Sequence, residues 1–210
     1  MRQRPIDLYV LRGLLGLAIG VLGIVGISMA SIEARPPPAR IPPPPDFTLG
    51  ISEDGRAFAF AGRVDFGLTA ALRALVAEHP QIRRMILDSN GGYIAEARGV
   101  VTVLRAHAIA THVEGHCASA CALIFTGGAQ RTLAPDARLG LHGYDIRNDR
   151  HYGMIDPRAE MQRDLAIYRA QSVSEDFVAK LTDLPRSPMW YPDHDELAAA
   201  GMITAADRPR

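Results

Sequence analysis

A single hydroxyl stands among small residues in segment 115–125, GHCASACALIF, directly before an apolar run. It belongs to Ser119, at the predicted first turn of a buried helix. A serine there can be a nucleophile, because the exposed amides and the dipole of the helix favour negative charge. It can equally be a small residue that lets a helix start pack tightly. The segment alone leaves both interpretations open.

The other groups that acyl transfer needs are also present in the chain. His142 follows a predicted short strand, 23 residues after Ser119, and can act as a base. Gly91 and Gly92 lie in a turn after another strand, and an amide from this pair, with the amide of Ala120, can bind an oxyanion. Each feature alone is a weak signal, since a histidine after a strand is often structural. Together they predict the parts of a hydrolase site.

Two cysteines flank the serine, Cys117 and Cys121. An oxidising compartment permits a disulfide, but two residues four apart on a regular helix have diverging Cβ vectors and bridge poorly. With no other soft ligands nearby, a zinc site is disfavoured. We therefore expect two small buried hydrophobic side chains, with no metal and no cofactor in the site.

Hydrophobic periodicity predicts the elements that position these residues. We expect strands at 57–64, 82–87 and 109–114, and paired short strands at 131–133 and 138–141. We expect helices at 67–79 and 93–107, a third from 117 or 118 to 127, and a fourth at 157–181. This alternation predicts an α/β domain with a largely parallel sheet. Sites in such sheets form at the carboxyl ends of strands, so the glycine turn and Ser119 should share one edge.

The first 46 residues of the chain have a different character. Arg2 and Arg4 precede an apolar stretch at 8–30, whose last 18 residues carry no charge. This pattern predicts a membrane anchor at 1–34 with the following chain exported, or a signal segment cleaved after Ala30. The proline-rich linker at 35–46 is expected to be an extended, stiff spacer. The globular domain is then 47–210.

Charge excludes one class of partner. The chain carries 23 basic and 23 acidic residues, so its formal net charge is zero. Because five arginines lie before residue 46, the domain itself is slightly acidic. We therefore expect no nucleic-acid partner.

Three motifs in order, LDSNGG (87–92), GHCASACALIF (115–125) and LGLHGY (139–144), resemble the proteolytic subunit of the Clp protease. More broadly, the chain resembles the ClpP/crotonase-like superfamily, which includes signal peptide peptidase SppA. The resemblance covers about 57–145 and resumes at 195–204. It implies a fold of repeated β-β-α units with a largely parallel sheet, with Ser119 as nucleophile, His142 as base, and Gly91 or Gly92 with Ala120 as the oxyanion hole. The leader and proline spacer fit predicted periplasmic Clp-like proteins.

Two departures from this family pattern concern the acid and the base. The family places its triad aspartate twelve residues before the glycine that matches Gly201, and Met189 stands there in this chain. Substitutes for that acid are Asp145, Asp183 and Asp193. SppA-like members use a lysine base, but the one lysine, Lys180, lies on a predicted helix without an evident match. A Ser-His dyad is therefore expected.

Two functions follow from these observations. The first is an extracytoplasmic serine peptidase, anchored through 8–30 or released to the periplasm, that acts on peptide or protein substrates. The second is a catalytically inactive ClpP-like module that serves as an oligomeric binding or scaffold protein at the membrane. Acyl-CoA chemistry of the crotonase type is disfavoured, because an exported protein does not ordinarily meet CoA thioesters. Superfamily members commonly form trimers or larger rings, so we expect a homo-oligomer.

Overall fold

The computed structural model describes residues 12, 15, 17, 19, 46–144 and 156–204. It divides into two compact units, Met1–Pro43 and Pro44–Arg210. The four described residues of the first unit are helical. No helix among the residues described is both long and apolar enough to cross a membrane. The predicted anchor at 8–30 and the linker at 35–46 lie almost entirely outside the described residues.

The second unit is a mixed α/β domain on one mostly parallel sheet, which confirms the fold class expected from the sequence. Its strands are β1 (Phe47–Ile51), β2 (Phe58–Gly62), β3 (Arg84–Ser89), β4 (Ala110–Ala118), β5 (Arg131–Leu133) and β6 (Arg138–Gly140). Strands β1 and β2 pair antiparallel, and β2, β3 and β4 are parallel neighbours. Strand β5 pairs with the first half of β4, and β6 pairs with its second half.

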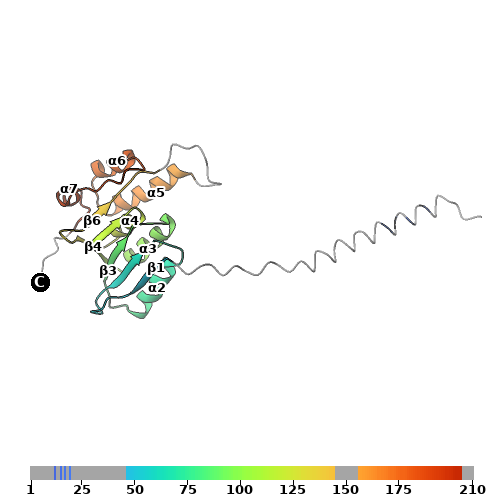
Figure 1. Ribbon diagram of the computed structural model, residues 1–210, viewed down its shortest axis with the longest axis horizontal. Coiled ribbons are helices and arrows are strands. Elements are labelled where there is room, and N and C mark those ends of the chain that lie inside the picture. The colour runs from blue at the N-terminus through green and yellow to red at the C-terminus, as the bar shows by residue number, and fades with distance from the viewer. Residues whose placement is uncertain are drawn as a thin grey trace, which may run out of the picture. The chain divides into compact units, whose positions relative to one another are not determined.

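Helices pack along this sheet in chain order. They are α2 (Leu68–Glu78), α3 (Ile94–Ala106), α4 (Ala120–Thr126), α5 (Pro157–Ala170), α6 (Glu175–Asp183) and α7 (His194–Ala199). In Figure 1, α5, α6 and α7 (orange to red) gather at the opposite end of the domain from β1 and α2. Every residue of α4 is buried, and α4 contacts α3, α5 and β4. The start of α4, where Ser119 lies, is therefore held by packing on several sides.

The structure corrects several predicted boundaries. Strand β4 runs through Ala118, so the helix begins only at Ala120 and not at 117. Strands β5 and β6 do not pair with each other, because each pairs with a different half of β4. The predicted helix at 157–181 is two helices, and Ser174 caps the second by accepting a hydrogen bond from the Phe177 amide. Strand β1, which lies at the edge of the sheet and pairs only with β2, was not predicted.

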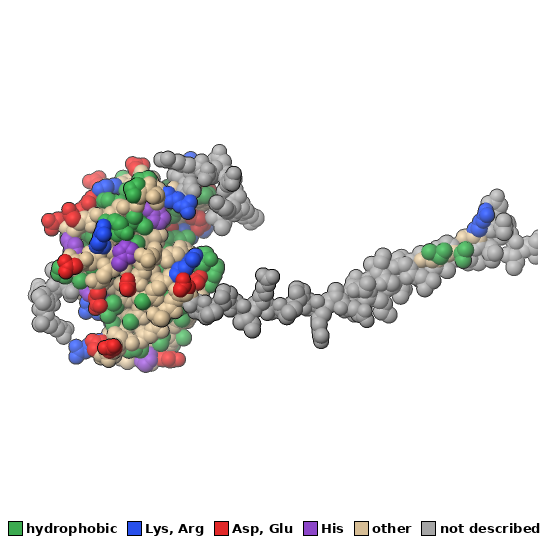
Figure 2. Space-filling view, viewed as in Figure 1, with side chains coloured by type: hydrophobic (Ala, Val, Ile, Leu, Met, Phe, Trp, Pro, Cys, Tyr) green, Lys and Arg blue, Asp and Glu red, His purple; other side chains and the backbone are tan. Residues whose placement is uncertain are grey.

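Charged side chains of both signs are interspersed on the face of the second unit that Figure 2 shows. Histidine side chains lie among them on the same face. This distribution accords with a domain of nearly balanced charge.

Candidate active site

Ser119 lies at a sharp turn between β4 and α4. Its backbone has φ 58° and ψ −123°, a conformation that non-glycine residues rarely adopt. The turn is held at both sides, since the Ser119 amide donates to Gly140 O at 2.9 Å and its carbonyl accepts from the Ala122 amide at 2.9 Å. The side chain makes no capping hydrogen bond with the helix. A strained turn that aims a serine away from its own helix is typical of hydrolase nucleophiles.

The side chain of Ser119 instead meets His142. Ser119 Oγ lies 2.7 Å from His142 Nε2, and His142 Nδ1 lies 2.8 Å from the carbonyl oxygen of Gly143. A carbonyl can only accept, so Nδ1 must carry the proton in this contact. In the neutral imidazole Nε2 is then the acceptor, and the Ser119 hydroxyl donates to it. This is the tautomer that a general base for Ser119 needs.

Two neighbours of His142 are tied to the segment before α7. Leu141 and Trp190 exchange two backbone hydrogen bonds of 2.8 Å, and the Gly143 amide donates to Pro185 O at 2.9 Å. A Cβ on Gly143 would lie 1.7 Å from Leu184 O, so only glycine fits this approach. The backbone around the histidine is therefore fixed on both sides.

The glycine turn reaches the same site through Gly92. The Gly91 amide donates to Ser89 Oγ at 3.0 Å. The turn also forms a backbone bridge with Val64, in which the Gly91 carbonyl accepts from the Val64 amide and the Tyr93 amide donates to the Val64 carbonyl. The amide of Gly92 itself takes no part in that bridge. The amide of Ala120 is the first of its helix, where no intrahelical acceptor exists. Gly92 and Ala120 line one cavity with Ser119, and Gly91 does not line it.

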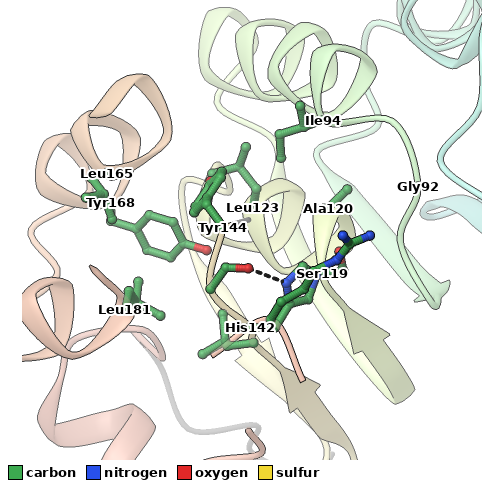
Figure 3. Close-up of a pocket in the computed structure, with 13 residues that line it drawn as sticks. Gly92, Ile94, Ser119, Ala120, Leu123, His142, Tyr144, Leu165, Tyr168 and Leu181 are labelled. Carbon is green, nitrogen blue, oxygen red and sulfur yellow. Dashed lines mark hydrogen bonds between the residues drawn. The ribbon is translucent and has the colours of Figure 1, made fainter. Parts of the chain in front are cut away.

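That cavity has a volume of about 430 Å³. Ser119 and His142 lie at one side of it, and apolar side chains from α3, α4, α5 and α6 form much of the rest (Figure 3). The apolar residues in its lining are Ile94, Leu123, Leu141, Leu165 and Leu181, with Tyr144 and Tyr168. A cavity of this size and character can take a side chain or a short peptide segment beside the hydroxyl.

None of the described candidate acids orients His142, because both ring nitrogens of His142 are already engaged. Asp193 caps α7 by accepting from the Glu196 amide at 2.8 Å, and Asp183 ends α6. Asp145 lies outside the described residues. Met189 lies against β6, where its Cγ would be 3.2 Å from a Cβ built on Gly140. A carbonyl thus occupies the place next to Nδ1 where a triad has a carboxylate.

Lys180 does not line the cavity at all. Its Nζ pairs with Glu196 at 2.6 Å and lies 3.9 Å from the centre of the Trp190 ring. The lysine is therefore engaged by Glu196 of α7 and by Trp190.

The two cysteines form a disulfide, so the expectation of two unlinked side chains was wrong. That expectation assumed one regular helix from 117. Cys117 instead lies in β4 and Cys121 in α4, and the turn at Ser119 brings their Cα atoms to 5.3 Å. Both side chains are fully buried. Among the described residues, no group of His, Cys, Asp or Glu side chains could hold a metal ion.

A buried carboxylate that the sequence analysis did not single out lies behind the cavity. Asp164 of α5 is fully buried and accepts from Arg98 Nε at 2.5 Å and from the Tyr144 hydroxyl. The sequence held a signal for it, because Asp164 interrupts the apolar positions Met161, Leu165 and Tyr168 of α5. An acid on a buried helix face must be paired, and its partners then become candidates for the site.

Both partners of Asp164 have shifted pKa values. Burial, followed by the charge of Asp164, raises the pKa of Tyr144 well above its usual range. Burial alone would lower the pKa of Arg98, but hydrogen bonds with Asp164 and Glu160 outweigh it and raise this pKa. Both groups therefore keep their protons at neutral pH and remain donors to the carboxylate.

Comparison with known proteins concerns the fold. No protein-family model matches the chain, and no curated protein matches its sequence. Among solved structures, the chain is similar to the ClpP protease catalytic domain from Plasmodium falciparum, with a TM-score of 0.59 and 15% sequence identity. The similarity covers 75% of this chain and 87% of that chain. The second unit therefore has a ClpP-like fold, as the sequence resemblance implied.

Proposed function

We propose that this chain is a serine peptidase in which Ser119 and His142 act as a dyad. The observation that carries the proposal is the 2.7 Å contact between Ser119 Oγ and His142 Nε2, with Nδ1 held by Gly143 O. In the reaction, Oγ attacks the carbonyl carbon of the substrate while Nε2 takes the hydroxyl proton. The C–N bond then breaks, and Nε2 returns that proton to the leaving amine. Nε2 then deprotonates a water molecule that attacks the acyl carbon. The bond between this carbon and Oγ breaks, and Nε2 returns the proton to Oγ, which releases the acid product.

The amides of Gly92 and Ala120 are the donors for the oxyanion in this proposal. They line the cavity beside Ser119, and a helix start is favourable for negative charge. The cavity is lined mainly by apolar side chains, and Arg186 is also part of its lining. The apolar part favours substrates with an apolar side chain next to the scissile carbonyl. Peptides with leucine or phenylalanine at that position should therefore be cleaved in preference to those with glycine.

We further propose that the domain works outside the cytoplasm, either anchored through 8–30 or released. The basic and then apolar start of the chain and the proline-rich linker support this location. The disulfide between Cys117 and Cys121 adds support, since disulfides persist in oxidising compartments. A reporter fused after Arg210 should be active outside the cytoplasm, and activity only inside it would contradict this proposal.

Self-association is also proposed, but on other grounds than those given by the sequence. Apolar residues of 157–181, such as Leu165 and Val178, are buried within the domain and do not offer an interface. Two neighbouring aromatic side chains are exposed instead, Phe66 (66%) and Tyr93 (40%), with ring centroids 4.3 Å apart. Light scattering should show a species larger than the monomer, which Phe66→Ser should weaken. A monomer at micromolar concentration would refute self-association.

One observation favours the alternative, a catalytically inactive ClpP-like scaffold at the membrane. Met189 stands where the family's aspartate is expected, and a neutral carbonyl stabilises an imidazolium less than a carboxylate does. A scaffold would keep the cavity and bind peptides without cleaving them.

Peptide turnover by the full chain separates the two functions. The peptidase proposal expects cleavage of a quenched fluorescent peptide library, with the loss of all cleavage in Ser119→Ala. Ser174→Ala is the matched control, because Ser174 also precedes a helix but lies outside the cavity. Binding without cleavage by the folded wild type would favour the scaffold.

A further inference from the structure

The unusual feature of the candidate site is that a neutral backbone carbonyl, Gly143 O, orients the imidazole of His142. A carbonyl can do this only if the backbone that carries it is held in place. One support is the pairing of Leu141 and Gly143 with the segment before α7. That support consists of backbone hydrogen bonds of the two residues that flank His142.

The second support is the side chain of the next residue. The Tyr144 hydroxyl donates to Asp164 Oδ2. Tyr144 also lines the cavity beside His142 (Figure 3). The contact to Asp164 therefore holds the residue that follows Gly143.

The same carboxylate is connected to the other half of the site. Arg98, which donates to Asp164 Oδ1, lies early in α3, the helix that follows the glycine turn. Arg98 also contacts the side chain of Glu160 and donates to its carbonyl oxygen at 3.0 Å. Asp164 thus links the segment of His142 to the helix that begins just after Gly92.

We propose that Asp164 is a positioning residue for His142. Through the Tyr144 hydroxyl it holds segment 142–144 so that the Gly143 carbonyl faces Nδ1, and through Arg98 it fixes this segment relative to the glycine turn. An effect of Asp164 on the reactivity of Ser119 rests on the proposed function, whereas its effect on the orientation and tautomer of the His142 imidazole does not. The dyad has no carboxylate next to His142. The carboxylate of Asp164 acts instead through Tyr144, two residues after His142.

A purely structural role for Asp164 is the competing explanation. Apolar side chains of similar volume usually hold helices together at least as well as a buried ion pair. What a buried pair adds is a fixed geometry, since the carboxylate accepts only where its donors point. A positioning role and a structural role differ in one measurable respect, which is the tautomer of His142.

The test is long-range ¹H–¹⁵N correlation spectroscopy on the full chain with ¹⁵N-labelled histidine. His142→Ala identifies the signal of His142. The wild type should show a single tautomer with the proton on Nδ1, whereas Tyr144→Phe and Asp164→Asn should show a mixture of tautomers. Labelling of Ser119 by a fluorophosphonate should slow by up to about 10²-fold in Tyr144→Phe, the loss expected when a catalytic group moves by about 1 Å.

Tyr191→Phe is the matched control, because the Tyr191 hydroxyl lies 3.1 Å from His116 Nε2. This change should shift the signal of His116 and leave that of His142 unaltered. An unchanged single tautomer of His142 in Tyr144→Phe would overturn the proposal, even if Asp164→Asn fails to fold. If the wild type is not labelled but Tyr144→Phe still shows a mixture of tautomers, the peptidase proposal is refuted and the positioning role is kept.

Discussion

Ser119 and Ser174 each stand directly before a helix, yet the structure uses them in opposite ways. Ser174 has an extended backbone, with φ −60° and ψ 145°, and its hydroxyl accepts from the Phe177 amide. Ser119 has φ 58° and ψ −123°, caps nothing, and places its hydroxyl 2.7 Å from His142. The first serine stabilises its helix and the second costs conformational energy. Backbone strain, and not the residue type, separates a structural serine from a candidate nucleophile.

The largest expected effect follows from exchanging each hydroxyl for a hydrogen. Ser119→Ala should lower peptide cleavage by about 10⁶-fold, because the nucleophile is lost. Ser174→Ala should leave cleavage intact and lower the free energy of unfolding by about 1 kcal/mol, the worth of a helix cap. Rate measurements and urea unfolding on both variants test the contrast, and equal effects on cleavage would remove it.

The next effect concerns the glycine turn that faces Ser119. Gly92 has φ 152°, and a Cβ there would lie 2.3 Å from Val64 O, so Gly92→Ala must displace the turn. Loss of one oxyanion donor should lower kcat by about 10²–10³-fold. Gly50→Ala is the control, because nothing lies within 4 Å of a Cβ at Gly50. An active Gly92→Ala protein would show that this amide is not a donor in the reaction.

The sequence predicted those parts of the site that are marked by short motifs, and missed those that depend on contacts between distant residues. Ser119, His142 and Gly92 belong to motifs at strand ends, and parallel sheets bring such ends together. The disulfide was not predicted, because it depends on β4 continuing to Ala118 and on the turn that follows. Asp164 was missed because its partners, Arg98 and Tyr144, are 66 and 20 residues away in sequence.

The prediction of one helix over 157–181 failed for a similar reason. Continuous apolar spacing over 157–181 concealed the break between α5 and α6. The cap formed by Ser174 with Glu175 and Asp176 in the first turn marks that break. Local polar signals of this kind define helix ends better than hydrophobic periodicity does.

A smaller effect is expected from the disulfide that spans the strained turn. Replacing Cys117 and Cys121 together by alanine should lower the free energy of unfolding by about 2 kcal/mol, the value for a very short loop. No disulfide adjoins Ser174, so reductant should not change the stability that the Ser174 cap contributes to α6. Urea unfolding with and without reductant measures the difference. A reductant-insensitive wild type with free thiols would contradict the bridge.

The smallest effect measures the strain at Ser119 itself. Ser119→Gly should be more stable than Ser119→Ala by about 1 kcal/mol, because glycine adopts positive φ without a steric penalty. At Ser174, whose backbone is extended, glycine exceeds alanine only through the general N-cap preference, so the difference between the two variants should be larger at Ser119. Thermal unfolding of the four variants makes the comparison, and equal stability of the Ser119 pair would argue that the turn is unstrained.

Covalent labelling tests the central claim, that Ser119 is a nucleophile activated by His142. The full chain is treated with a fluorophosphonate, and the adduct is located by mass spectrometry of its peptides. The account predicts one adduct per chain on Ser119, none in Ser119→Ala, and a steep loss in His142→Ala. A folded wild type without an adduct, or with an adduct that persists in Ser119→Ala, would contradict it.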